Sequence, residues 1–102
     1  MAINPSQQVP TLIAENGTLK LTQSIAILDY LEERYPDKKP LYPKDLRGRC
    51  IVRNLVMLIS ADVQPIANLR ILEHIDTLGS SKEEWAKDYL QKGLYGITAL
   101  FV

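Results

Sequence analysis

Gln23 and Ser24 are the polar residues with the clearest chemical potential, because they stand where a strand-like pattern passes into a helical one. The first N–H groups of a helix have no partner within the helix, and the helix dipole places partial positive charge there. A carboxylate can bind at such a position, with the Ser24 hydroxyl and the Gln23 amide as further donors. An ordinary helix cap at Ser24 explains the same residues without a ligand, so both interpretations stay open.

Cys50 is a second candidate, because Arg47, Arg49 and Arg53 surround it in the sequence and positive charge favours a thiolate. The chain offers no base partner and no second cysteine, so we favour a partly buried structural thiol. His74 lies near an expected helix end, where a favourable dipole interaction is the simpler explanation. One histidine and one cysteine do not make a convincing metal site, and we expect none.

The composition argues against several other classes of protein. The 102 residues include 12 Lys and Arg and 12 Asp and Glu, so a broad surface for nucleic acid or anionic membrane is not expected. The hydrophobic content of 46% is ample for a packed core, and a single cysteine fits a reducing compartment. We find no apolar run as long as a membrane span and no secretory signal. We therefore expect a cytoplasmic protein, with the mitochondrial matrix as the alternative.

A β-hairpin is predicted ahead of the two polar residues. Asn16-Gly17 suits a two-residue type I′ turn between strands at 11–14 and 18–21, because both central positions of this turn need positive φ. Pro10 lacks a backbone N–H, so it marks the edge or the beginning of the first strand. A lone two-stranded sheet is marginal in water, and we expect its partner strands before residue 1.

Helices are predicted for most of the remaining chain. Apolar residues recur at helical spacing after Ser24, which we expect to be the N-cap, and Pro36 stops this first helix. The stretch 37–44 is rich in proline and reads as a linker. These features divide the chain into residues 1–36, a linker at 37–44 and an all-helical part at 45–102.

The all-helical part contains its own start and stop signals. Asp45 is a plausible N-cap for a helix that Pro65 should kink or end. The helical pattern then resumes and ends at Gly79. Ser81 and Glu84 form a capping-box pattern for a last helix that reaches the end of the sequence.

Longer motifs connect these elements to a known family. The stretches "NPSQQVPTL", "QSIAILDYLEE" and "QPIANLRIL" together resemble the zeta class of the glutathione S-transferases, whose members act as maleylacetoacetate isomerases. The resemblance implies a fold of the α/β plus all-α class. The hairpin and first helix would form the C-terminal half of a thioredoxin-like domain, followed by the first helices of a glutathione-transferase helical domain. It covers most of the chain, which we expect to be a central segment of such a protein.

The resemblance implies a glutathione site in the first part of the chain. In this family the peptide bond before the equivalent of Pro10 is cis, which turns the backbone N–H and C=O of Val9 toward glutathione. The cysteinyl unit of the tripeptide pairs with that backbone like an added strand. Gln23 and Ser24 would then bind the γ-glutamyl carboxylate.

A second group of contacts is implied around Pro65. The family carries substrate-side and glutathione contacts at Gln64, Asn68, Leu69 and Arg70, partly across a dimer interface. A solvated helix face remains the alternative for Gln64 and Asn68. Arg70 stands where a small polar residue is usual, and it could instead attract a dicarboxylate substrate.

The implied activity is glutathione-dependent cis–trans isomerisation of maleylacetoacetate or a related acid in phenylalanine and tyrosine catabolism. The full-length protein would be a homodimer without nucleic acid or membrane partners. The family's thiolate-stabilising motif would lie before residue 1, so we expect no catalytic residue in this chain and no useful turnover from the chain alone. The competing hypothesis is a non-catalytic interaction module, because a fold does not dictate a function.

Overall fold

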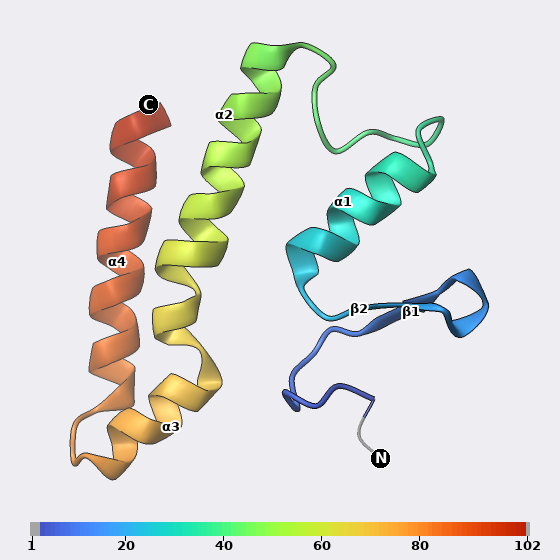
Figure 1. Ribbon diagram of the computed structural model, residues 1–102. Coiled ribbons are helices and arrows are strands. Elements are labelled where there is room, and N and C mark those ends of the chain that lie inside the picture. Colours follow the sequence, from blue (N-terminus) through green and yellow to red (C-terminus); the bar gives the residue numbers. More distant parts are fainter. Residues whose placement is uncertain (1–2, 102) are drawn as a thin grey trace. The chain divides into compact units, whose positions relative to one another are not determined.

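The computed structural model describes residues 3–101, and the chain separates into two compact units on either side of the Leu41–Tyr42 boundary (Figure 1). The first unit contains a hairpin and one helix, and the second contains only helical elements. The boundary lies within the segment 37–44, where the sequence predicts a linker. Each unit is described below by itself.

The first unit begins with the predicted hairpin. Strands β1 (Leu12–Ala14) and β2 (Leu19–Leu21) pair antiparallel, with Leu12 opposite Leu21. The leucines of both strands are half-buried, whereas Ile13 between them is 50% exposed. This alternation is that of a hairpin with one covered face and one open face.

The turn of the hairpin has positive φ at both predicted positions, and Glu15 before them also has positive φ, at 52°. Asn16 has φ 55° and ψ 32°, and Gly17 has φ 91°. The backbone N–H of Thr18 donates to the carbonyl of Glu15 at 3.2 Å, which closes the turn. Asparagine and glycine adopt positive φ at low cost, so this dipeptide sets the register of both strands.

Helix α1 (Ser24–Arg34) completes the secondary structure of the first unit. Its half-buried residues include Ile25, Ile27 and Tyr30, whereas Leu28, Leu31 and Tyr35 of the apolar pattern are 41%, 37% and 51% exposed. The helix ends ahead of Pro36, as the sequence predicts. The backbone N–H of Leu41 donates to Oε2 of Glu32 at 2.8 Å, so the chain after the helix is tied back to it.

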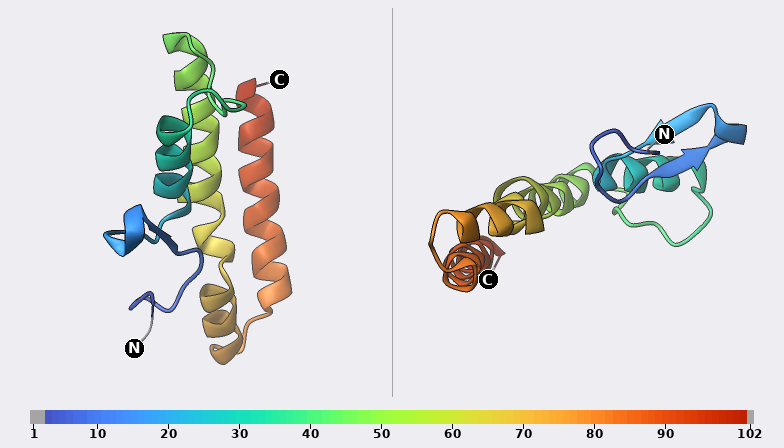
Figure 2. Two further views of the ribbon diagram at one scale, coloured as in Figure 1. Left: turned by 90° about the vertical axis from the view of Figure 1, so that its right-hand side faces the viewer. Right: turned by 90° about the horizontal axis from the view of Figure 1, so that it is seen from below.

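The second unit is a helical hairpin with an interrupted first arm (Figures 1 and 2). Its elements are α2 (Leu46–Met57), the π-helical segment η2 (Leu58–Val63), the 3₁₀ turn η3 (Pro65–Ala67), α3 (Leu69–Thr77) and α4 (Lys82–Phe101). Helix α4 packs against η2, η3 and α3. The predicted fold class is thus confirmed, with a hairpin and helix followed by a helical part.

Local signals fix the helix ends of this unit. The Asp45 carboxylate accepts from the N–H of Gly48 at 2.7 Å, which confirms the predicted N-cap of α2. Gly79 follows α3 with φ 78°, a conformation that suits glycine. The Ser81 hydroxyl oxygen accepts from the N–H of Glu84 at 3.2 Å and caps α4.

Helix α4 passes close to η2 at Gly93. A Cβ placed on Gly93 would lie 2.9 Å from one γ carbon of Val63 and closer still to the other. Carbon atoms do not approach so closely without displacement of one of them. Glycine at this position therefore allows the backbone of α4 to pass directly over Val63.

Tyr42 and Ile75 are the most buried apolar residues among those described, at 7% and 9% exposure. The guanidinium carbons of Arg49 and Arg53 each lie 5.4 Å from the centre of the Tyr42 ring, in the range of a cation–π contact. Cys50 lies between these two arginines on α2 and is exposed. The expectation of a partly buried thiol is therefore wrong, because α2 turns this position away from its packed face.

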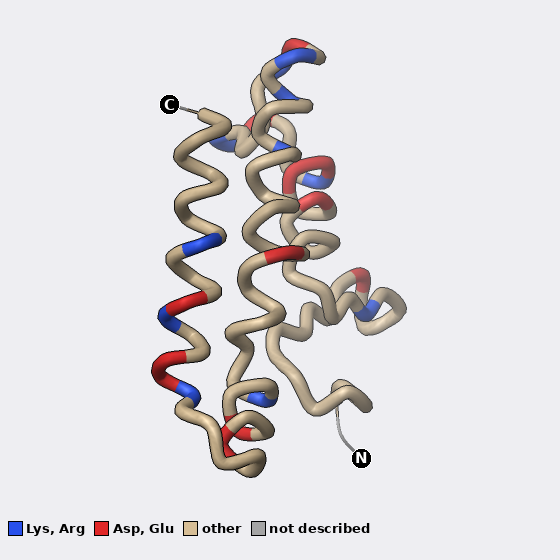
Figure 3. Tube along the Cα trace, turned by 90° about the vertical axis from the view of Figure 1, so that its left-hand side faces the viewer, with Lys and Arg blue, Asp and Glu red and all other residues tan. Residues whose placement is uncertain are grey.

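Charge on α4 is confined to its first part (Figure 3). Asp76 and Asp88 hold the pKa of Lys82 and Lys92 above the usual value, through a side-chain hydrogen bond first and charge attraction second. The side chains of both pairs are 40–68% exposed, so these pairs add little to stability. From Gly93 to its end the helix carries no charged residue.

One helical run, Leu46–Thr77, passes a test of length and composition for a membrane span. It has 32 residues and a mean hydropathy of 1.4 over its most apolar window. The sequence prediction that no apolar run has this length is therefore not upheld by these measures. Core helices of soluble proteins pass the same test, and the break before α3 interrupts this run.

Candidate ligand sites in the two units

The first candidate site lies at the open end of the hairpin. The strand register places Leu12 opposite Leu21, so the residues just before β1 and just after β2 come to the same end. Val9 lies three residues before the Leu12–Leu21 pair and Ser24 three residues after it, on the same end of the hairpin. The Val9–Pro10 peptide bond is cis, as the family resemblance implies, and Val9 is 93% exposed.

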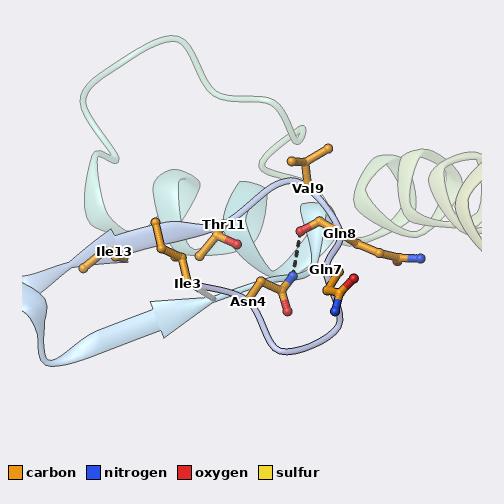
Figure 4. Close-up of a pocket in the computed structure, with 7 residues that line it drawn as sticks. All are labelled: Ile3, Asn4, Gln7, Gln8, Val9, Thr11 and Ile13. Atoms are coloured by element: carbon orange, nitrogen blue, oxygen red, sulfur yellow. Dashed lines mark hydrogen bonds between the residues drawn. The ribbon is translucent and has the colours of Figure 1, made fainter. Parts of the chain in front are cut away.

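The loop that leads to Val9 is held by Asn4, which is 8% exposed (Figure 4). The Asn4 side-chain amide donates to the carbonyl of Gln8 at 2.7 Å, and its oxygen accepts from the N–H of Ser6 at 2.9 Å. The N–H of Gln7 also donates to the Asn4 carbonyl at 3.0 Å. Three hydrogen bonds from one residue thus fix the backbone immediately before Val9.

A shallow groove of about 540 Å³ lies along the same loop and β1. Val9, Thr11 and Ile13 line it at alternate positions, and Ile3 and Asn4 lie on the other side (Figure 4). Gln7 and Gln8 complete its lining. The sequence analysis did not identify Asn4, although an asparagine before turn residues is a known signal for a local side-chain-to-backbone bond.

The beginning of α1 differs from the prediction in one respect. Gln23 is the N-cap, with extended backbone, and its carbonyl accepts the first helical bond from Ile27 at 3.0 Å. Ser24 is already the first helical residue, so the predicted N-cap at Ser24 is wrong. No side chain caps α1. Gln23 and Ser24 are both exposed, and the first N–H groups of the helix are not bonded by a cap side chain.

The second candidate site is the break in the helical run of the second unit. Pro65 begins η3, and Asn68 has the extended backbone angles φ −65° and ψ 143°. The Asn68 side-chain oxygen accepts from the N–H of Arg70 at 3.2 Å and caps α3. The predicted effect of Pro65 is therefore confirmed, and the break starts a new helix with Asn68 as its cap.

The predicted residues of this second group do not share one environment. Gln64 and Arg70 are exposed, and Leu69 is 69% exposed. Asn68 is half-buried, with its amide oxygen fixed by the cap. Of this group, Asn68 is thus the residue whose orientation the structure fixes best. Its Nδ2 group is the donor that remains for an acceptor such as a carboxylate.

The two candidate sites belong to different units. Val9, Pro10, Gln23 and Ser24 lie in the first unit, and Gln64, Asn68, Leu69 and Arg70 in the second. Among residues 3–101, no group of His, Cys, Asp and Glu side chains could hold a metal ion.

Comparison with known proteins identifies relatives of this chain. Residues 1–33 match the family described as "Glutathione S-transferase, N-terminal domain". The chain is 39% identical to the maleylacetoacetate isomerase of Emericella nidulans, in an alignment that covers 97% of this chain and 46% of that protein. It is 41% identical to the maleylacetoacetate isomerase maiA of Aspergillus fumigatus, over 98% of this chain and 46% of the relative.

Solved structures show the same relationship. The holo structure of a maleyl pyruvate isomerase, a bacterial glutathione S-transferase of the zeta class, superposes with a TM-score of 0.82 at 38% identity, over 92% of this chain and 45% of that one. A maleylacetoacetate isomerase from Anaeromyxobacter dehalogenans, with glutathione bound in its active site, gives a TM-score of 0.81 at 38% identity, over 92% and 44%.

The chain spans about half the length of the curated relatives it matches. Over that span its hairpin, first helix and interrupted helical run follow the fold of the solved relatives. Sequence and fold together therefore relate this chain to the glutathione transferases, through the match of residues 1–33 and the similarity of nearly the whole chain to relatives of the zeta class.

Proposed function

We propose that the intact protein containing this chain is a glutathione-dependent cis–trans isomerase of maleylacetoacetate or a related acid. The observation that carries this proposal is the cis Val9–Pro10 bond beside a Val9 that is 93% exposed, at the end of the hairpin from which the chain also continues into the uncapped start of α1. The names of the relatives support the choice of reaction. Phenylalanine and tyrosine catabolism is the proposed setting.

The residues of the first unit fit glutathione by their donor chemistry. Glutathione is a short peptide with an exposed γ-glutamyl carboxylate. The Val9 backbone offers one donor and one acceptor to its cysteinyl unit, in the manner of an added strand. The Ser24 hydroxyl, the Gln23 amide and the free N–H groups of α1 suit the carboxylate, and the dipole of the helix adds to the attraction.

Bound glutathione would supply a thiolate that adds to the cis double bond of the acid and leaves after rotation about the resulting single bond. The role of the described residues is to bind and orient. Val9 would fix the cysteinyl unit so that its sulfur is directed to one position, and fixed geometry lowers the entropic part of the barrier. Asn68 and Arg70 would bind the carboxylates of the acid substrate, because they offer an amide donor and a guanidinium.

Ser24→Ala tests the glutathione site directly. We expect the dissociation constant for glutathione, measured by titration calorimetry on the intact protein, to rise roughly five- to tenfold, the loss of one hydrogen bond to a charged group at an exposed position. Thr18→Ala is the matched control, since its hydroxyl donates to Glu15 in the hairpin turn. Unchanged affinity in Ser24→Ala would contradict the glutathione assignment.

The competing function is a non-catalytic interaction module. An isomerisation assay on the intact protein distinguishes this module from an isomerase. We expect the intact protein to convert maleylacetoacetate to its trans isomer only when glutathione is present. We also propose that the 102-residue chain alone binds glutathione weakly and does not turn over, because it spans less than half of its relatives. Glutathione binding without isomerisation by the intact protein would favour the module.

A further inference from the structure

The break before α3 removes the helical partner of one backbone carbonyl. In a continuous α-helix the carbonyl of Ile66 accepts from the N–H of Arg70, four residues later. Here that N–H donates to the side-chain oxygen of Asn68 instead, at 3.2 Å. The cap that starts α3 therefore leaves the Ile66 carbonyl in need of another donor, because half-buried carbonyls are nearly always paired.

Trp85 provides that donor from another helix. Its indole N–H donates to the Ile66 carbonyl at 3.1 Å, across 19 residues of sequence. The indole ring is half-buried and packs on Tyr89, with ring centres 4.6 Å apart. The backbone N–H of Trp85 donates to the carbonyl of Ser81 at 3.0 Å, so the residue is anchored in the first turn of α4.

We propose that Trp85 is a positioning residue for Asn68, and through it for a carboxylate of the acid substrate. The indole bond fixes η3 at Ile66, two residues before Asn68, and thereby sets where α3 begins. With its oxygen engaged by the cap, Asn68 presents Nδ2 to the ligand in one orientation. This inference rests on the proposed function for its ligand, and on the two hydrogen bonds alone for its structural part.

Trp85→Phe is the informative variant, because it removes the indole N–H and keeps an aromatic ring against Tyr89. We expect the apparent KM of the intact protein for the acid substrate to rise about fivefold, the effect of one net hydrogen bond of average strength. The KM for glutathione is measured beside it, because the family carries glutathione contacts as well as substrate contacts in the group around Pro65; we expect it to change less than twofold, since Val9, Gln23 and Ser24 lie in the other unit. Tyr89→Phe keeps the ring contact and the indole bond, and should leave both values unchanged.

A double-mutant cycle tests whether Trp85 acts through Asn68. Asn68→Ala should raise the same KM, and the combination with Trp85→Phe should add little to it, because both changes remove one interaction. Fully additive effects would overturn the proposal. A change in the KM for glutathione as large as that for the acid would also overturn it, because Asn68 would then serve glutathione or the variant would have lost structure in general.

A second measurement does not depend on the reaction. Hydrogen exchange of the segment 64–72 should speed up in Trp85→Phe relative to the wild-type protein, because Ala67 and Arg70 donate their amides within the break. Unchanged exchange there overturns the positioning role whatever the activity. Faster exchange in a protein whose wild type does not isomerise the acid overturns the proposed function instead and leaves the structural part standing.

Discussion

Gly93→Ala is expected to lower the free energy of unfolding by about 1–3 kcal/mol, the usual cost of forcing an extra methyl group into a packed contact. The added Cβ would lie 2.9 Å from one γ carbon of Val63 and closer to the other. Valine is branched at Cβ and has few rotamers, so it cannot move aside cheaply. Urea unfolding of the intact protein measures the change.

Gly96→Ala is the matched control, because both glycines lie in α4 and nothing lies within 4 Å of a Cβ at Gly96. Alanine is the better helix former by up to about 1 kcal/mol, so this control should be neutral or stabilising. The addition of Val63→Ala to Gly93→Ala should recover part of the loss, because it removes the two γ carbons. Equal effects at both glycines would show that the packing contact is not the cause.

Asn4→Ala is expected to cost about 1–3 kcal/mol of stability, because it removes two hydrogen bonds to the backbone, each of which contributes about 0.5–1.5 kcal/mol net. The variant loses the bond to the Gln8 carbonyl and the bond from the Ser6 N–H. Since these bonds fix the backbone before Val9, we also expect weaker glutathione binding by the intact protein. Unfolding and titration calorimetry measure the two effects separately.

Two further variants show which hydrogen bond matters. Asn4→Asp keeps an oxygen for the Ser6 N–H but places a second oxygen at the Gln8 carbonyl, 2.7 Å away in the native protein. We expect it to be as harmful as alanine, because two oxygens repel at that distance. Ser6→Ala changes only a side chain that takes no part in these bonds, and should be neutral. A harmless Asn4→Asp would show that the Gln8 bond is dispensable.

Much of the local structure followed from single signals in the sequence. Asn16-Gly17 predicted the hairpin turn, and Asp45 and Gly79 predicted helix ends that the structure confirms. Each signal works through the φ range or the side-chain donor of a residue at its own position, so no distant contact is needed. Pro65 predicted its break for the same reason, because it lacks an N–H and crowds the preceding turn.

The wrong predictions concern choices between near-equivalent local states. Ser24 and Gln23 are both acceptable at the N-cap position. The helix begins one residue earlier than predicted, with Gln23 as its N-cap. Cys50 was expected to be partly buried from a frequency alone, whereas the side that α2 presents to its neighbours is set by packing. The expectation of no apolar run of membrane length was not upheld for a different reason, because a mean hydropathy over a long helical run tolerates the polar residues that interrupt its apolar stretches.

The sequence by itself determined the turns, the caps and the family motifs at Val9-Pro10, Gln23-Ser24 and Gln64-Pro65. Only the tertiary structure decided that Asn4 holds the loop before Val9, that Gly93 passes over Val63 and that Trp85 supplies the donor for Ile66. The physical reason is distance along the chain. Nothing in the local sequence around Ile66 indicates that its carbonyl will be bonded by Trp85, 19 residues away. Only folding brings the two groups together.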